Sequence, residues 1–205
     1  QIELIGNTFN NQEEAAVKLD SVSDLLVKGN SFYSSDSLEF INGLELVACG
    51  DSIIIKQNYF QAKTGRGIEI NCIDTTSFKY IYNNSFSYAG GTAIFIAGGA
   101  KWNFYNNSCN MYYDSTVAYQ SNVLHFNAVE KVNAYNNIFS NNTGGSLFSV
   151  LPGFSNFNYN NIELNGGTVT TLAPTFVDWQ NLGFGTNSLQ ATPMFVSDSN
   201  LHIYA

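Results

Sequence analysis

Ile81-Tyr82-Asn83-Asn84-Ser85-Phe86 is one copy of a six-residue pattern that recurs along this chain. The pattern opens with an apolar or aromatic residue, has asparagine in fourth place and mostly ends in phenylalanine. Other copies begin at Leu4, Val27, Ile55, Phe104 and Ala134, and a weaker seventh is Asn158-Tyr159-Asn160-Asn161-Ile162. Successive asparagines, from Asn7 to Asn161, lie 23 to 30 residues apart. Such a period, with strand-forming residues around each asparagine, indicates a solenoid of stacked repeats.

A second strand signal precedes each of these asparagines except the first. The segments are Val17-Lys18-Leu19, Leu44-Glu45-Leu46, Ile68-Glu69-Ile70, Ile94-Phe95-Ile96, Leu124-His125-Phe126 and Leu147-Phe148-Ser149. An apolar residue on either side of a middle residue is the alternation of a strand with one buried face. Such short strands cannot bury a face alone, but stacked in parallel at about 4.8 Å they enclose a continuous core. The sequence therefore predicts an all-β chain, a parallel β-helix of about seven rungs.

The repeated asparagine and the aromatic residue after it each have a predicted structural role. Asparagine tolerates left-handed backbone conformations, and at a repeated turn it can hydrogen-bond to its own copy one rung along. We expect an internal amide ladder on this ground. The residues that end each copy should form an inward stack: Phe9, Phe32, Phe60, Phe86 and Phe139, with Cys109 replacing one member.

Composition excludes several kinds of partner. Only 12% of the residues are charged, the net charge is −8, and Arg66 is the single arginine. Binding to nucleic acid needs clustered Lys and Arg, so we expect none, and anionic membrane surfaces are disfavoured for the same reason. The charge also favours a neutral glycan over a polyanionic one, unless a local basic patch or bound cations override it. No apolar run is long enough to cross a membrane, so we expect no membrane insertion.

The three cysteines do not make a disulfide framework. Cys49 and Cys72 fall near equivalent places in successive repeats, so a bridge between rungs is geometrically possible. The alternative is that all three, with Cys109, are buried free thiols.

Residues 1–166 are predicted to be the β-helix repeats, and residues 167–205 a capping segment of the same domain. The chain opens inside a repeat, so we expect it to be an N-terminally truncated piece of a larger protein with adjoining domains. The closing segment breaks the repeat and carries Trp179, Pro174 and Pro193. A solenoid end exposes unpaired strands and an open core, and aromatic bulk with proline suits an irregular C-terminal cap.

The asparagine repeat resembles the right-handed parallel β-helix superfamily, the fold of pectate-lyase-like proteins, over residues 2–166. The segment 187–196 followed by 200–203 resembles the tail of secreted bacterial β-helix proteins, with Thr192 where that tail usually has aspartate. The resemblance implies a right-handed parallel β-helix and a secreted or cell-surface, extracellular location. It implies no single function, because this fold hosts lyases, hydrolases, adhesins and inert spacers.

One candidate catalytic constellation lies on the strands of the second signal. If their flanking aliphatic residues point inward, the middle residues point outward and stack in a column: Lys18, Glu45, Glu69, Phe95, His125 and Phe148. Glu45 and Glu69 on adjacent rungs are like charges that would raise one pKa or bind a cation. Arg66 and Lys63, in a nearby loop, could reach the same place. The other interpretation is a solvated face. We predict no metal site or other cofactor, although calcium is possible.

The second constellation is aromatic. The residue two before each repeated asparagine is a tyrosine in four consecutive copies: Tyr82, Tyr105, Tyr135 and Tyr159. Alternation puts these side chains outward, where a phenol stripe can contact sugars, and the neighbouring Asn83, Asn106, Asn136 and Asn160 can add amide contacts. Two alternatives remain: a loop or a neighbouring domain covers the tyrosine stripe, or the stripe is exposed without binding anything.

The leading hypothesis is a segment of an extracellular bacterial β-helix protein that serves as a surface-binding or structural module. Its expected partner is a polysaccharide or cell-surface glycan, bound through the tyrosines. The alternative is a polysaccharide lyase or glycoside hydrolase that acts in a groove on the outer strand face, with Glu45, Glu69, Lys18, His125 and Arg66 as candidates. Whether the chain is an enzyme stays open.

Overall fold

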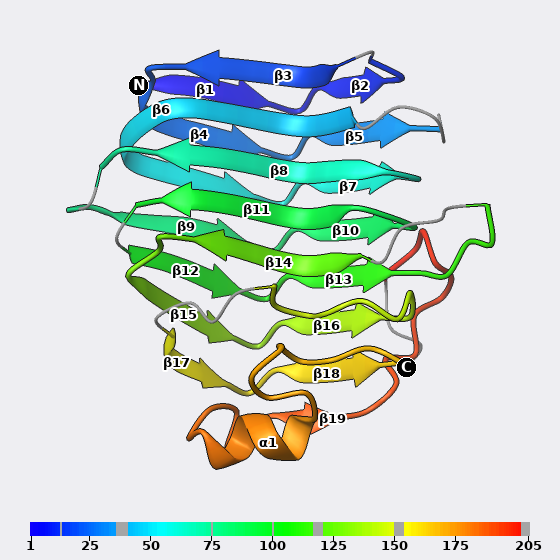
Figure 1. Cartoon of the computed structure of the whole chain (residues 1–205). Coiled ribbons are helices and arrows are strands. Elements are labelled where there is room, and N and C mark those ends of the chain that lie inside the picture. The colour runs from blue at the N-terminus through cyan, green and yellow to red at the C-terminus, as the bar shows by residue number, and fades with distance from the viewer. Residues whose placement is uncertain are drawn as a thin grey trace.

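Parallel strands stacked in rungs form almost all of the regular structure (Figure 1). The computed structural model describes residues 1–12, 14–35, 41–74, 76–99, 101–116, 121–149 and 154–201. In this part of the chain the strands make an eleven-stranded and an eight-stranded sheet, and every strand pair is parallel. The predicted all-β parallel solenoid is confirmed.

Each rung contributes to three strand stacks, which we call sheets A, B and C. Sheet C contains β3 (Ala15–Asp20), the first part of β6 (Ile41–Lys56), β8 (Gly65–Cys72), β11 (Thr92–Gly98) and β14 (Asn122–Asn127). Sheet A contains β1 (Ile2–Ile5), β4 (Ser23–Lys28), the last part of β6, β9 (Phe78–Tyr82), β12 (Lys101–Tyr105), β15 (Lys131–Tyr135) and β17 (Phe154–Asn158). Sheets A and C join through β6 into the eleven-stranded sheet.

Sheet B is the eight-stranded sheet. Its strands are β2 (Thr8–Asn10), β5 (Ser31–Ser34), β7 (Tyr59–Ala62), β10 (Ser85–Tyr88), β13 (Ser108–Met111), β16 (Ile138–Asn141), β18 (Asn161–Leu164) and β19 (Leu189–Gln190). The chain runs through C, A and B in turn, as β8, β9 and β10 show (Figure 1).

The inward stack of aromatic residues is confirmed. Phe32 and Phe60 have ring centroids 4.6 Å apart, and Phe60 and Phe86 4.8 Å apart, with nearly parallel planes in both pairs. Cys109 is in register between Phe86 and Phe139 and is fully buried. Glycine faces the stack from sheet C: a Cβ on Gly67 would lie 2.8 Å from Phe86 Cδ1 and 2.7 Å from the Ala93 carbonyl oxygen. The stack therefore leaves no room for a side chain at this position.

The amide ladder between sheets A and B is also confirmed. Each ladder asparagine except the last donates from its backbone nitrogen and its side-chain nitrogen to the side-chain oxygen of the asparagine one rung along, at 2.9 to 3.1 Å. The members are Asn7, Asn30, Asn58, Asn84, Asn107, Asn137 and Asn160. Asn160 is the last member, and its backbone nitrogen donates instead to Ser188 Oγ.

The left-handed backbone conformation belongs to the residue before each ladder asparagine. Gly29, Gln57, Asn83 and Tyr159 all have φ between 56° and 66°, whereas no ladder asparagine has a positive φ. The prediction that the repeated asparagine itself takes this conformation is therefore wrong. What the ladder asparagine contributes in each rung is its side-chain amide, because that amide satisfies backbone groups that would otherwise be buried without partners.

The seventh copy is one residue out from its predicted alignment. Asn160, not Asn161, is the ladder member, and Asn161 is the first residue of β18. The inward residues that flank each turn are five positions apart in every copy, as with Ile81 and Phe86, and in the last copy they are Phe157 and Ile162. Counting back from Ile162 would have placed the asparagine correctly.

Cys49 and Cys72 are register partners on adjacent rungs, and both are free buried thiols, as is Cys109. The Cys72 thiol donates to the Cys49 carbonyl oxygen at 2.9 Å. The free-thiol alternative is therefore correct.

A short helix, α1 (Phe176–Asn181), packs beside the last rungs (Figure 1). Thr175 caps its start, and Asp178 returns the capping interaction to Thr175. Trp179 is fully buried, with its ring centroid 5.4 Å from that of Phe148 and 5.5 Å from that of Phe157. After β19 the chain runs back along the outer surface of sheet B, where the Ser87 hydroxyl donates to the Asp198 carbonyl oxygen and Tyr59 to that of Ser199.

Candidate functional site

The tyrosine column lies on the outer surface of sheet A. Strand pairing puts Ile5, Lys28, Lys56, Tyr82, Tyr105, Tyr135 and Asn158 in one register line along the solenoid. All three tyrosines are partly exposed. The structure therefore brings together three of the four tyrosines singled out in the sequence.

Tyr159 does not belong to this column. The register line continues from Tyr135 to Asn158, and Tyr159 is in the left-handed turn position, where its side chain is 60% exposed. The one-residue shift of the seventh copy causes the difference. It also makes Asn160 a buried ladder residue, so this residue cannot offer its amide at the surface, unlike the exposed Asn83, Asn106 and Asn136.

The rings of Tyr105 and Tyr135 meet face to face, so these two residues present their edges and hydroxyl tips. The ring centroids of Tyr105 and Tyr135 are 5.9 Å apart with an interplanar angle of 23°, and Lys56 Nζ lies 5.6 Å from the Tyr82 ring centroid. A sugar ring cannot enter a 5.9 Å gap between two rings, since carbon atoms in contact are already about 3.5 to 4.0 Å apart on each side. The hydroxyl tips are therefore the parts of the column that remain open to hydrogen bonding.

A second line of amides runs beside the tyrosines, and sequence reasoning missed it. Asn133 donates to Asn103 Oδ1 at 2.9 Å and Asn156 to Asn133 Oδ1 at 3.0 Å, while the Tyr105 hydroxyl also donates to Asn103 Oδ1. The two other column hydroxyls, of Tyr82 and Tyr135, have no hydrogen-bond partner within the described residues. Each of these asparagines stands two positions before the tyrosine-column residue of its strand. Strand alternation puts both positions on the same face, so the sequence could have revealed this line.

The predicted column on sheet C is confirmed for five of its six members. Lys18, Glu45, Glu69, Phe95 and His125 are successive register partners. Phe148 is the exception: it pairs with Leu124 and is fully buried. The last rung is shifted by one residue relative to β14, and Phe148 turns inward to pack against Phe139 and Trp179.

The charges of the sheet C column neutralise one another. Lys18 Nζ lies 2.6 Å from Glu45 Oε1, and Arg66 Nη1 lies 2.6 Å from Glu69 Oε2. Asn42 donates to both carboxylates, at 3.3 Å to Glu45 and 2.8 Å to Glu69. The hydrogen bond from Lys18 lowers the pKa of Glu45, so the expectation that crowding raises a carboxyl pKa is wrong for this residue. Lys63 pairs with Asp114 instead, at 3.8 Å.

Aromatic groups close the other end of this column. The Arg66 guanidinium lies 4.2 Å from the Phe95 ring centroid, and the rings of Phe95 and His125 are 4.7 Å apart. Burial, reinforced by the positive charge of Arg66, lowers the pKa of His125. Both causes favour the neutral imidazole, whose ring plane is tilted by 34° from that of Phe95. It is two register positions from Glu69, with Phe95 between them.

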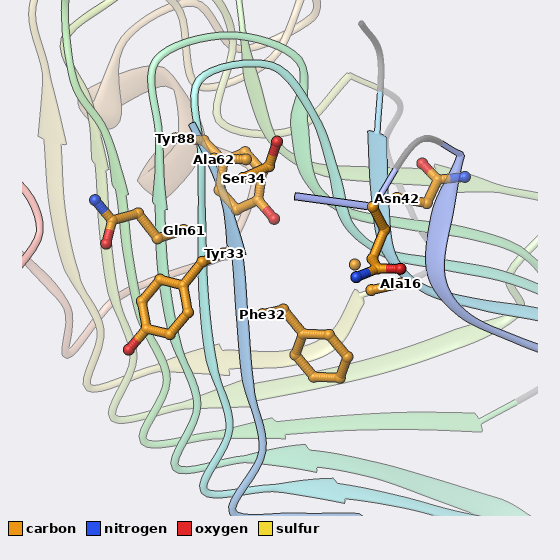
Figure 2. Close-up of a pocket in the computed structure, with 10 residues that line it drawn as sticks. Ala16, Phe32, Tyr33, Ser34, Asn42, Gln61, Ala62 and Tyr88 are labelled. Carbon is orange, nitrogen blue, oxygen red and sulfur yellow. The ribbon is translucent and has the colours of Figure 1, made fainter. Parts of the chain in front are cut away.

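The cavity drawn in Figure 2 is too small for a glycan. It lies between the ends of β5 and β7 and the starts of β3 and β6, and Phe32, Asn42 and Tyr88 are among its lining residues. Its volume is about 10 Å³, room for about one water molecule. Ser34 Oγ and Asn42 Oδ1 are buried beside it with no hydrogen-bond partner in the described structure.

One lysine is wholly interior. Lys79 is 0% exposed and bonds Asp74 Oδ2 at 2.8 Å and the carbonyl oxygens of Asp74 and Ser77. The hydrogen bond from Lys79 is the main cause that lowers the pKa of Asp74. This pair secures the turn between sheets C and A and faces no cavity of the site.

Residues 1–109 match the family model described as "Right handed beta helix region". No curated protein and no solved structure matches the chain. Among the described residues there is no group of three or more His, Cys, Asp or Glu side chains that could hold a metal ion. No helix within the described residues has the length and apolarity of a membrane span.

Proposed function

The chain belongs to the right-handed β-helix family, and we propose that it is a glycan-binding module of an extracellular protein. The outer surface of sheet A is the proposed site. The observation that carries the proposal is the paired line of phenol tips and carboxamides in register, from Tyr82 to Tyr135 and from Asn103 to Asn156.

The chemistry of these groups matches that of sugar hydroxyls. A phenol can donate and accept a hydrogen bond, and a carboxamide carries two donors and an acceptor with two lone pairs. The Tyr82 and Tyr135 hydroxyls are not used within the described fold, and the Asn156 side chain lies at the end of its line. A surface that repeats such donors and acceptors on neighbouring rungs, as β12 and β15 do at about 4.8 Å, suits a polymer that lies along the solenoid axis.

The lyase or hydrolase alternative has less support. Acid–base catalysis needs one group held protonated and another held ready to accept a proton. On sheet C, Glu45 and Glu69 are both held by cations, and the lowered pKa of Glu45 makes it a poor proton donor at neutral pH. A solvated face with paired charges explains the sheet C column as well as a catalytic site does.

Affinity electrophoresis tests the proposed function. The protein is run through native gels that contain neutral or acidic polysaccharides, with and without calcium. We expect retardation by at least one polysaccharide, and the double variant Tyr105→Ala/Tyr135→Ala should weaken it about tenfold or more, as loss of central contact residues does. Circular dichroism checks that the variant stays folded.

Tyr159→Asn is the matched control, because it removes an exposed tyrosine outside the column and leaves a residue that tolerates the left-handed conformation. Its retardation should equal that of the wild type. Absence of retardation by every polysaccharide, or an equal loss in the control, would refute the proposal.

A further inference from the structure

The outer surface of sheet A carries four of the eight basic residues of an acidic protein. The net charge of the chain is −8, yet four lysines occupy outward positions of this one sheet: Lys28, Lys56, Lys101 and Lys131. The ion pairs of the described residues use Lys18, Lys63, Arg66 and Lys79. None of the four lysines on sheet A therefore has a carboxylate within 4 Å in this part of the chain.

These lysines are stacked as like-charged pairs. Lys28 is the register partner of Lys56, and Lys101 is the register partner of Lys131. Like charges directly opposite each other on neighbouring strands destabilise a sheet. An anion that lies between two such ammonium groups removes this repulsion, so binding and charge relief act in the same direction.

The first pair continues the tyrosine column beside a hollow. A cavity of about 380 Å³ opens next to Lys56, with Leu26 and Ile54 among its lining residues and Asp24 and Gln1 also on it. Apolar side chains beside an ammonium group suit the ring of a sugar that carries an acidic substituent. The exposed carboxylates of Glu3, Asp24 and Glu130 lie near this surface, and none is within 4 Å of a nitrogen of these lysines.

We infer that the glycan bound along sheet A is anionic, and that Lys28 and Lys56 contact its carboxylate or sulfate groups directly, without a bridging metal ion. The inference rests on the proposed function and gives it a substrate class. It reverses the expectation of a neutral glycan, which was based on net charge alone, because Lys28 and Lys56 form a local basic patch that overrides the net charge.

The test uses pairs of polymers that share a backbone and differ in charge. Carboxymethylcellulose is compared with hydroxyethylcellulose, and dextran sulfate with dextran, in native gels that contain EDTA. We expect the wild type to bind an anionic member about tenfold more tightly than its neutral partner, the size expected of two exposed ion pairs. Whichever of the two anionic polymers is preferred identifies carboxylate or sulfate as the recognised group. The preference should shrink at about 1 M salt, where the Debye length is about 3 Å.

Two double variants locate the effect. Lys28→Gln/Lys56→Gln should abolish the preference for the anionic member of each pair. Lys18→Gln/Lys63→Gln changes the net charge equally on other surfaces and should keep the preference. Equal binding to both members by the wild type, or equal losses in the two double variants, would overturn the inference.

The two proposals fail in different ways. If the neutral polymers retard the protein as strongly as the anionic ones, and Tyr105→Ala/Tyr135→Ala weakens both, the glycan site stands and its anionic character is wrong. If no polymer retards the wild type, both are wrong.

Discussion

Asn107 donates a hydrogen bond from its side-chain nitrogen to Asn137 Oδ1, 2.9 Å away on the next rung. The same nitrogen donates to the Ile81 carbonyl oxygen at 2.9 Å on the preceding rung. One side chain thus connects three rungs, and the ladder holds the turn between sheets A and B in register. The tyrosine column depends on this register, since each column residue stands two positions before a ladder asparagine.

Asn107→Ala should lower the free energy of unfolding by about 1 to 3 kcal/mol, because it leaves buried donors and acceptors on both neighbouring rungs without partners. Urea denaturation at 25 °C measures the change. The control is Asn106→Gly, next to it in the chain: Asn106 is exposed and has φ of 55°, which glycine adopts without strain. An unchanged midpoint for Asn107→Ala would contradict the structural role of the ladder.

Gly67→Ala should destabilise the fold by about 1 to 3 kcal/mol, the usual result of overpacking. The new methyl group would lie 2.8 Å from Phe86 Cδ1 and 2.7 Å from a backbone oxygen, and backbone gives way less readily than a flexible side chain. Gly50→Ala is the control, since its Cβ would meet only Asp74 Cβ, at 3.4 Å. Equal stability of the two variants by thermal denaturation would show that the Phe stack is looser than described.

Acid should weaken the fold partly through Asp74. The pKa of Asp74 is lowered in the folded protein, mainly by its hydrogen bond from Lys79. The unfolded chain therefore binds the proton at a higher pH than the folded chain does. The stabilisation is present above the unfolded pKa of about 3.9 and is lost as the pH falls through the lower folded value.

Asp74→Asn should flatten the dependence of the unfolding free energy on pH below about 4. At neutral pH it should cost about 1.5 to 3 kcal/mol, the usual value of a hydrogen bond to a charged group. Urea denaturation between pH 2 and pH 7 gives both quantities. Glu3→Gln, at an exposed carboxylate, is the control and should leave the unfolding free energy at neutral pH unchanged. A pH profile identical to that of the wild type would remove Asp74 from the acid response.

Trp179→Ala should cost about 3 to 5 kcal/mol, as truncation of a buried tryptophan does. The indole is fully buried against Phe148, Phe157 and Phe184 beside the last rungs. The comparison variant is Val177→Ala, on the exposed side of the same helix. A loss below about 1 kcal/mol for Trp179→Ala would mean that α1 is not needed to protect the core.

The repeat of asparagine and phenylalanine was enough to predict the solenoid, because both residues act inside one rung and between neighbouring rungs. The strand register on sheet C followed from the same alternation for Lys18 through His125. The prediction failed at Tyr159, because it aligns the seventh copy one residue too late, and at Phe148, because the last rung is shifted by one residue relative to β14. A single-residue shift exchanges inward and outward side chains, and periodicity alone does not fix it.

The candidate site was predictable only in part. Lys28 and Lys56 stand in the sequence column before the tyrosines, but their significance depends on which carboxylates lie near them, and the sequence does not give that. Likewise, Glu45 and Glu69 are adjacent, as expected, yet Lys18, Arg66 and Asn42 reach them from three different strand positions. The path of residues 191–201 over sheet B follows from side-chain contacts to backbone oxygens, for which no pattern exists.

The most direct measurement of the central claim is a titration calorimetry comparison of two double variants with the glycan that retards the wild type most. Tyr82→Phe/Tyr135→Phe removes two hydroxyls that the described fold does not use, and Glu45→Gln/Glu69→Gln changes the sheet C column. The account predicts weaker binding, by about tenfold, for the tyrosine variant and unchanged binding for the glutamate variant. Unchanged binding for the tyrosine variant, with a loss for the glutamate variant, would place the glycan on sheet C and contradict the account.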